Sequence, residues 1–317
     1  ILVRSNNPEY YQRGGDSFIL SPLYCGSQAT GWIATKDHAI RFFKKDTGLT
    51  LPTAMAISGA AANPNTAGGE DTTMRRWSIS FLMTLLNIRL GLWQPNPRLG
   101  KGSFRRDTPQ PSFVAPGLGS LLSNYYDETK DYVELSDGGH FDNTGLYELL
   151  RRRVRIIVLS DGSCDPDYSL DDLARVLMLA QTDFGVTVDF QGLDVSQSQD
   201  IWEKLDVSPE QPNTYRGKGY PWVADGVRAK VLRDGYAVAT ITYPGTAPGA
   251  KRMLGYLVYV KPALVEYAPV KTLSYALNNA EFPHQSTAEQ FFSEYRFEAY
   301  RSLGHTIGRK MITEVFV

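Results

Sequence analysis

The chain has 317 residues, with 33 Lys and Arg against 34 Asp and Glu. A nucleic-acid-binding protein needs a basic face to neutralise phosphates, so this charge balance argues against nucleic acid as a partner. Hydrophobic residues make up 42% of the chain and charged residues 21%, which excludes disorder over most of its length. The cysteines, Cys25 and Cys164, are too few for a disulfide scaffold. Four histidines without zinc-ligand spacing predict no metal, and we expect no other cofactor.

The most hydrophobic stretch, 77–93, contains Asn87 and Arg89 and is too short to span a bilayer. Its pattern predicts an amphipathic helix over 78–92, either a core helix or an interfacial helix near the mouth of an active site. Residues 1–5 contain no signal peptide and read as a strand without a preceding turn, which indicates a piece of a longer polypeptide. We therefore expect a cytoplasmic or membrane-associated protein.

The middle of the chain alternates between helical and strand patterns. A helical pattern over 145–153 precedes an apolar strand over 155–160, and a second helix over 169–181 begins with a Ser-x-x-Asp capping pattern at Ser169. Such alternation predicts an α/β fold with a parallel sheet covered by helices. We expect the strand at 132–135 to neighbour 155–160 in that sheet, with a right-handed crossover between them.

The last third of the chain is richer in strands. Residues 227–243 alternate around an Asp-Gly pair at 234–235, which predicts a hairpin, and 255–261 supply another strand. A helix is expected over 286–303, with an aromatic face made by Phe291, Phe292, Tyr295 and Tyr300. Before these elements, 191–223 are rich in Ser, Gln, Pro and Gly and predict a linker or a long excursion.

The most informative stretch is 132–143, where a strand runs directly into Asp137, Gly138 and Gly139. The glycines permit a sharp turn with positive φ and a close approach by another backbone. The carboxylate is thereby presented at the C-terminal edge of a strand, where open α/β sheets bind their ligands. There it can act as a general base towards a hydroxyl nucleophile, with His140 lining the same cleft. The alternative is an ordinary Asp-Gly turn.

A second candidate is Ser58, within the small-residue stretch 53–65. A nucleophile elbow needs small neighbours because its turn is strained and tightly packed. Ala56 and Ala60 stand where the G-x-S-x-G pattern has glycine, so a helix N-terminus packed against the sheet is the other interpretation. The remaining histidines have no partner motif and are expected to be surface or structural residues: His38, His284 and His305.

The block formed by Asp137, Gly138 and Gly139, followed by Asn143, resembles the DGG block of patatin-like phospholipases. Those enzymes use a Ser-Asp dyad without a histidine. The stretch around Ser58 is similar to a small-residue block of the family that does not carry the nucleophile. Three further segments resemble large bacterial patatin-like proteins: 21–26, 81–93 and 282–304. The resemblance implies a patatin-like sheet flanked by helices, with an added β-rich and helical C-terminal region, and a role in lipid degradation.

In that family a glycine-rich oxyanion loop and a G-x-S-x-G elbow precede these blocks, and neither motif occurs in this sequence. The resemblance therefore implies that Asp137 acts with a serine on a segment absent from this chain, and that the isolated chain is inactive. Two alternatives stay open. The chain is a self-contained esterase that pairs Ser58 with Asp137, or it is a non-catalytic lipid-binding or interaction module.

The resemblance also implies a domain organisation and partners. We expect an incomplete patatin-like α/β core over 1–190 and a C-terminal extension over 191–317 packed on it. The candidate active site comprises Asp137, lined by Ser58, Gly138, Gly139, His140 and Asn143. The expected partners are a lipid or ester substrate, the missing N-terminal segment, and a membrane surface contacted through 75–93.

Overall fold

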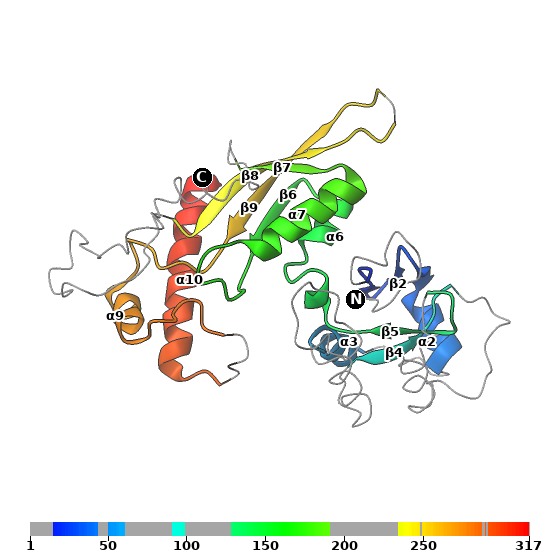
Figure 1. Cartoon of the computed structure of the whole chain (residues 1–317), viewed down its shortest axis with the longest axis horizontal. Coiled ribbons are helices and arrows are strands. Elements are labelled where there is room, and N and C mark those ends of the chain that lie inside the picture. The colour runs from blue at the N-terminus through cyan, green and yellow to red at the C-terminus, as the bar shows by residue number, and fades with distance from the viewer. Residues whose placement is uncertain are drawn as a thin grey trace. The chain divides into compact units, whose positions relative to one another are not determined.

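The structure is a computed structural model of the chain (Figure 1). It describes residues 15–43, 50–60, 91–98, 128–190, 234–247, 249–286, 289 and 291–316. The chain divides into two compact units, 1–143 and 144–317. Both contain helices together with sheets, so the protein is of mixed α and β class. The predicted parallel sheet is found only in part, because among the described strands only 156–160 and 253–260 pair in parallel and the other pairings are antiparallel.

The described part of the first unit contains two small antiparallel sheets (Figure 1). The first sheet has three strands that follow one another along the chain: β1 (Ile19–Leu20), β2 (Tyr24–Ser27) and β3 (Gly31–Ala34). Two helices come next: α2 (Thr35–Phe43) and α3 (Leu51–Ser58). The second sheet pairs two strands that are distant in sequence: β4 (Leu92–Pro95) and β5 (Tyr132–Leu135).

Helix α3 begins at strong local signals and packs on the second sheet. The Thr50 side chain caps it by accepting a hydrogen bond from the Thr53 amide at 3.3 Å, and Pro52 stands in its first turn. Its one buried residue, Ile57, joins Val133 and Leu135 of β5 in a hydrophobic cluster. The end of α3 is therefore held close to the end of β5.

The second unit is built on a four-stranded mixed sheet with the order β6-β9-β8-β7 (Figure 1). Its strands are β6 (Ile156–Ser160), β7 (Thr187–Asp189), β8 (Tyr236–Tyr243) and β9 (Met253–Val260). Strands β6 and β9 are parallel, and the other two pairings are antiparallel. The helices of this unit are α6 (Leu146–Arg151), α7 (Asp171–Phe184), α9 (Val270–Asn278) and α10 (Glu294–Val315).

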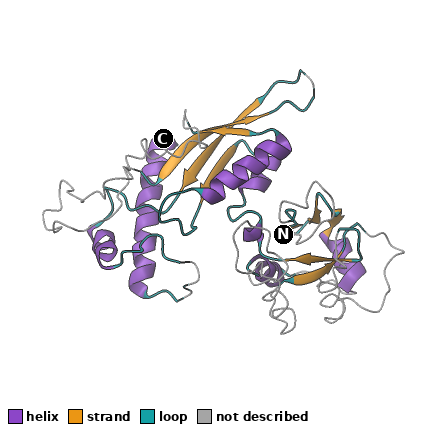
Figure 2. Ribbon diagram, viewed as in Figure 1, coloured by secondary structure: helices purple, strands orange, loops and turns teal. Residues whose placement is uncertain are grey.

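Helices α6 and α7 lie along one face of this sheet (Figure 2). Accordingly Ile157 and Leu159 of β6 are buried, whereas Ile156 and Val158 on the opposite face are exposed. The other helices belong to a separate cluster, in which Leu303 and Ile307 of α10 pack with the 263–276 region. The buried side chains thus form one core under the sheet and a second core beside α10.

Strands 132–135 and 156–160 form as predicted, but the prediction that they are neighbours is wrong. Strand β5 pairs with β4 in the first unit, while β6 pairs with β9 in the second. The local pattern of an apolar strand does not specify its partner, and both partners come from sequence-distant segments. For the same reason the chain does not divide at 190: β6 and β7 share a sheet with β8 and β9, and the division falls after residue 143.

Several predicted elements lie partly or wholly outside the described residues. The strand at 1–5, the linker at 191–223 and the first arm of the 227–243 hairpin are outside them. Of the helix predicted over 78–92, the described end is extended instead, because Leu92 and Trp93 belong to β4. The helix predicted from 286 begins at 294, where Ser293 caps it, and Phe291 and Phe292 precede it.

Candidate functional site

Asp137 lies at the end of β5, in a turn that its own side chain caps. Its Oδ1 accepts a hydrogen bond from the Gly139 amide at 2.8 Å, at the start of the short 3-10 helix η2 (Gly138–His140). The preceding residue, Ser136, is buried and donates its hydroxyl to the Ala60 carbonyl at 2.9 Å, which ties the turn to the segment after α3. Asp137 is half-buried, and its Oδ2 has no hydrogen-bond partner among the residues that the structure describes.

The glycines of this turn serve a different purpose from the one expected. Neither Gly138 nor Gly139 has a positive φ, so the expectation of a left-handed turn is wrong. At Gly139 it is the missing side chain that matters, because a Cβ there would lie 2.2 Å from Asn143 Oδ1 and 3.2 Å from Asp137 Oδ1. A Cβ on Gly138 would meet open space. His140 is half-buried in the same turn.

A cavity of about 330 Å³ opens beside this turn in the first unit. Its walls are mostly apolar and come from β1, α3 and β5; they include Phe18, Leu20, Met55, Ile57 and Leu135. Ser58, Ser136 and Gly138 complete the lining. Of the sequence-predicted site residues, the cavity therefore brings together Ser58 and Gly138. Asp137 does not line it, but both of its chain neighbours do.

Ser58 lies at the C-terminal end of a helix, which is not where a nucleophile elbow places its serine. It is the last residue of α3, followed by the cap Gly59, whereas an elbow presents its serine before a helix N-terminus. The final turn of a helix offers carbonyl oxygens and the negative end of the dipole, which disfavour an oxyanion. The alternative expectation, that 53–65 begins a helix, is also wrong, since α3 begins at Leu51.

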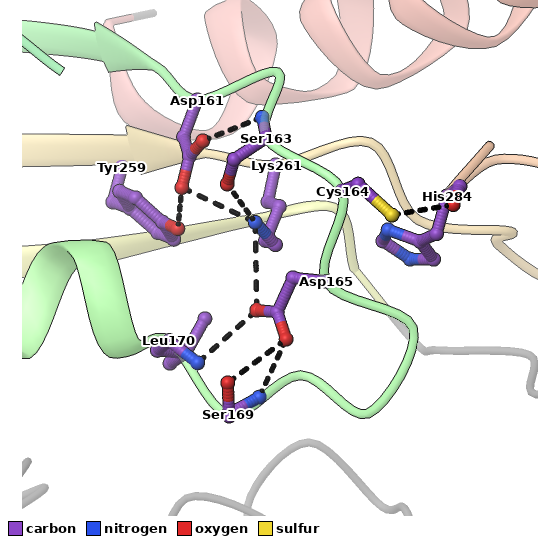
Figure 3. A network of polar contacts seen from close by, with 9 residues as sticks. All are labelled: Asp161, Ser163, Cys164, Asp165, Ser169, Leu170, Tyr259, Lys261 and His284. Atoms are coloured by element: carbon purple, nitrogen blue, oxygen red, sulfur yellow. Dashed lines mark hydrogen bonds and ion pairs between the residues drawn. The ribbon is translucent and has the colours of Figure 1, made fainter. Parts of the chain in front are cut away.

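A second polar constellation lies at the carboxyl ends of β6 and β9, and sequence reasoning missed it (Figure 3). Asp161 follows β6 directly and Lys261 follows β9, and the parallel register places these ends side by side. The Lys261 Nζ lies 3.2 Å from Asp161 Oδ2 and 3.5 Å from Asp165 Oδ2, and it donates to Ser163 Oγ at 3.1 Å. None of the three charged side chains is more than 10% exposed.

Burial and hydrogen bonding determine which of these groups are ionised. Burial alone would raise the pKa of Asp161, but the Tyr259 hydroxyl at 2.5 Å, the Ser163 amide and the charge of Lys261 together lower it below the ordinary value. Burial and the neighbouring Asp161 carboxylate raise the pKa of Tyr259 far above its ordinary value. Tyr259 therefore stays protonated and donates to an ionised Asp161.

The Ser163–Lys261 contact has the spacing of a Ser-Lys dyad but not its electrostatics. A lysine can take the serine proton only in its neutral, unprotonated form, and a neutral Lys261 would leave the two buried carboxylates without a cation. The network instead stabilises its loop: Asp165 accepts hydrogen bonds from the Ser169 and Leu170 amides. These hydrogen bonds hold Leu170 at a φ of 55°, a left-handed backbone conformation that is unfavourable for residues other than glycine.

This loop also explains why one predicted cap is absent. Ser169 was expected to cap α7, but its hydroxyl donates to Asp165 Oδ1 at 3.1 Å, and the N-cap of α7 is Leu170. On the other side of the loop, the Cys164 thiol donates to the His284 carbonyl at 2.8 Å (Figure 3). His38 and His284 are buried and His305 is exposed.

Comparison with known proteins identifies no relative, because the chain matches no protein-family model, no curated protein and no solved structure. Among the described residues, no helix combines the length and the apolarity needed to cross a bilayer.

Proposed function

We propose that this chain is the Asp-bearing part of a serine lipid acyl hydrolase that resembles the patatin-like phospholipases. Asp137 is its general base, and the nucleophilic serine belongs to a segment outside these 317 residues. One observation carries the proposal. The Asp137 carboxylate is fixed through Oδ1 by the Gly139 amide, while Ser136 and Gly138, its chain neighbours, line an apolar cavity.

The reaction follows from the properties of that carboxylate. The serine hydroxyl passes its proton to Asp137 while its oxygen attacks the ester carbonyl carbon. The tetrahedral intermediate collapses, the alcohol leaves with the proton returned by Asp137, and an acyl-enzyme remains. Water then attacks the acyl-enzyme, gives its proton to Asp137, and releases the fatty acid as the serine is restored. General base catalysis of this kind contributes on the order of 10²–10⁴-fold.

Two features of the first unit support this proposal, one for the general base and one for a lipid substrate. The hydrogen bond from Gly139 orients the carboxylate before the reaction, and such preorganisation lowers the entropic cost of reaching the transition state. The adjacent cavity of about 330 Å³ falls in the size range of small-molecule sites, roughly 300–1,000 Å³. Its apolar walls suit an acyl chain better than a polar head group.

The two alternatives have less support. Ser58 lines the cavity, which favours a self-contained esterase, but its place at the C-terminal end of α3 disfavours an oxyanion there. A non-catalytic lipid-binding module would use the same cavity without any role for the Asp137 carboxylate. Removing that carboxylate therefore separates the hypotheses.

The test supplies the chain with the proposed additional segment, which should carry a G-x-S-x-G elbow. Hydrolysis of p-nitrophenyl esters and of phospholipid is measured for the parent, for Asp137→Asn and for Asp131→Asn. Asp131 is an exposed carboxylate at the opposite end of β5 and serves as the matched control. We expect about 10²–10⁴-fold loss in Asp137→Asn and parent activity in Asp131→Asn.

Other results would contradict the proposal in distinguishable ways. Parent activity in Asp137→Asn would remove the general base. Turnover by the isolated chain, lost in Ser58→Ala together with fluorophosphonate labelling, would favour the self-contained esterase. Phospholipid binding without hydrolysis by the extended chain would favour the binding module.

A further inference from the structure

Helix α3 is unusual among the described helices because it and its flanks carry no charge. Residues 50–60 contain no Asp, Glu, Lys or Arg. A helix that is apolar on all sides belongs either in a protein core or in lipid. Yet Leu51 is 74% exposed and Met55 is 65% exposed, and Ile57 is the one buried residue of the helix. Within the described part of the first unit, most of the apolar surface of α3 is therefore not covered by the core.

The exposed side chains of α3 are continuous with the cavity beside Asp137. Leu51 and Met55 are four residues apart, so they lie on the same face of the helix, one above the other. Met55 also lines the cavity, together with Ala54 and Ser58 at the end of the same helix. One apolar surface therefore leads from solvent along α3 to the cavity wall.

We propose that α3 is the element through which this protein contacts a lipid surface. Leu51 and Met55 enter the acyl layer, and a lipid chain passes Met55 into the cavity. The absence of charge over 50–60 means that neutral zwitterionic lipid is sufficient, with no need for anionic head groups. A protein partner fits less well, because a partner that covered Met55 would block access to the cavity that Met55 lines. The fate of the lipid in the cavity rests on the proposed function, but the binding does not.

The experiment measures sedimentation of the 317-residue chain with sucrose-loaded phosphatidylcholine vesicles. We expect binding that is unchanged between about 0.1 M and about 1 M salt, because no ion pair is involved. Leu51→Gln/Met55→Gln should lower the partition coefficient by about tenfold per side chain. The matched control is Phe291→Gln/Tyr295→Gln, a second exposed apolar pair with the same spacing in the other unit, which should bind like the parent.

A fluorescent label gives an independent measurement that does not depend on a loss of binding. The label is placed at Met55→Cys in a Cys164→Ser background, because Cys164 is exposed and Cys25 is buried. Its emission should shift to the blue on addition of vesicles, whereas a label at Ser274→Cys, an exposed site on α9, should not respond. Unchanged circular dichroism establishes that each variant is folded.

Three results would overturn the inference. The first is equal vesicle binding by Leu51→Gln/Met55→Gln. The second is loss of binding in the control pair alone. The third is a concentration-dependent dimer that the α3 variant abolishes, without vesicle binding by the parent, since it would assign this face to a second copy of the chain. Because vesicle binding requires no turnover, parent hydrolysis in Asp137→Asn would end the proposed function and leave this inference standing.

Discussion

The Nζ of Lys261 lies 3.2 Å from Asp161 Oδ2, and the two residues stand directly after the paired ends of β9 and β6. The backbone reinforces this pairing, because the Asp161 amide donates to the Val260 carbonyl at 2.9 Å. The Lys261–Asp161 ion pair therefore joins strands whose sequences are about a hundred residues apart, and a second ion pair, between Lys261 and Asp165, anchors the loop that contains Asp165 (Figure 3).

Lys261→Met should destabilise the second unit strongly. It leaves Asp161 and Asp165 buried without a cation, which typically costs about 3–5 kcal/mol of unfolding free energy. Urea denaturation measures the change. Lys271→Met is the matched control, because Lys271 pairs with Glu298 on the surface, and its variant should unfold like the parent. Equal midpoints for both variants would contradict a structural role for Lys261.

The stability of the second unit should fall at acid pH through Asp161. Because its folded pKa lies below the ordinary 3.8, the unfolded chain binds the proton more tightly than the folded one. The resulting stabilisation is fully present above pH 3.8 and is lost as the pH falls through the folded value. Denaturation at a series of pH values should show a shallower acid loss in Asp161→Asn. An identical acid profile in both proteins would disprove this contribution.

Asp165→Asn should loosen the loop before α7 without unfolding the sheet. The carboxylate accepts from the Ser169 amide at 2.8 Å and from the Leu170 amide at 3.1 Å, and these bonds offset the left-handed backbone of Leu170. Hydrogen exchange at these two amides should become faster, while Asp167→Asn, at a neighbouring exposed carboxylate, leaves it unchanged. Unchanged exchange in Asp165→Asn would show that the loop is held by other contacts.

Gly139→Ala and Gly138→Ala should differ sharply although the residues are adjacent. A Cβ at 139 lies 2.2 Å from Asn143 Oδ1, so the turn must shift, at a cost of about 1–3 kcal/mol of unfolding free energy. A Cβ at 138 meets open space, and that variant should unfold close to the parent. Asn143→Ala in the Gly139→Ala background should recover part of the loss. Equal denaturation midpoints for the two alanine variants would refute the close packing over Gly139.

The sequence predicted individual elements better than their pairing. Strands β5 and β6 and helices α6 and α7 follow from apolar periodicity, which depends on neighbours within a few residues. The pairing of β4 with β5, and of β6 with β9, depends on segments far apart in sequence, and nothing local encodes it.

The same contrast holds at the candidate site. The Asp137 turn was identifiable because the carboxylate and its glycines are contiguous. The small neighbours of Ser58 do not specify its place in a helix, whereas Thr50 as a cap and Pro52 in the first turn set the start of α3, so that Ser58 is its last residue. The sequence does not predict the Lys261–Asp161 pair, because each residue alone follows an ordinary apolar strand.

The strand order of the second sheet also determines when its strands can pair during synthesis of the chain. Strands β6 and β7 leave the ribosome well before β8 and β9, the strands with which they pair. At a synthesis rate of about 5–20 residues per second, roughly 5–20 s pass between the synthesis of β6 and that of β9. During this time the apolar edge of β6 is unpaired and can pair with other chains. A chain that stopped at residue 190 would never leave that state. Aggregation during synthesis, rather than instability of the finished fold, is therefore the hazard that this topology creates.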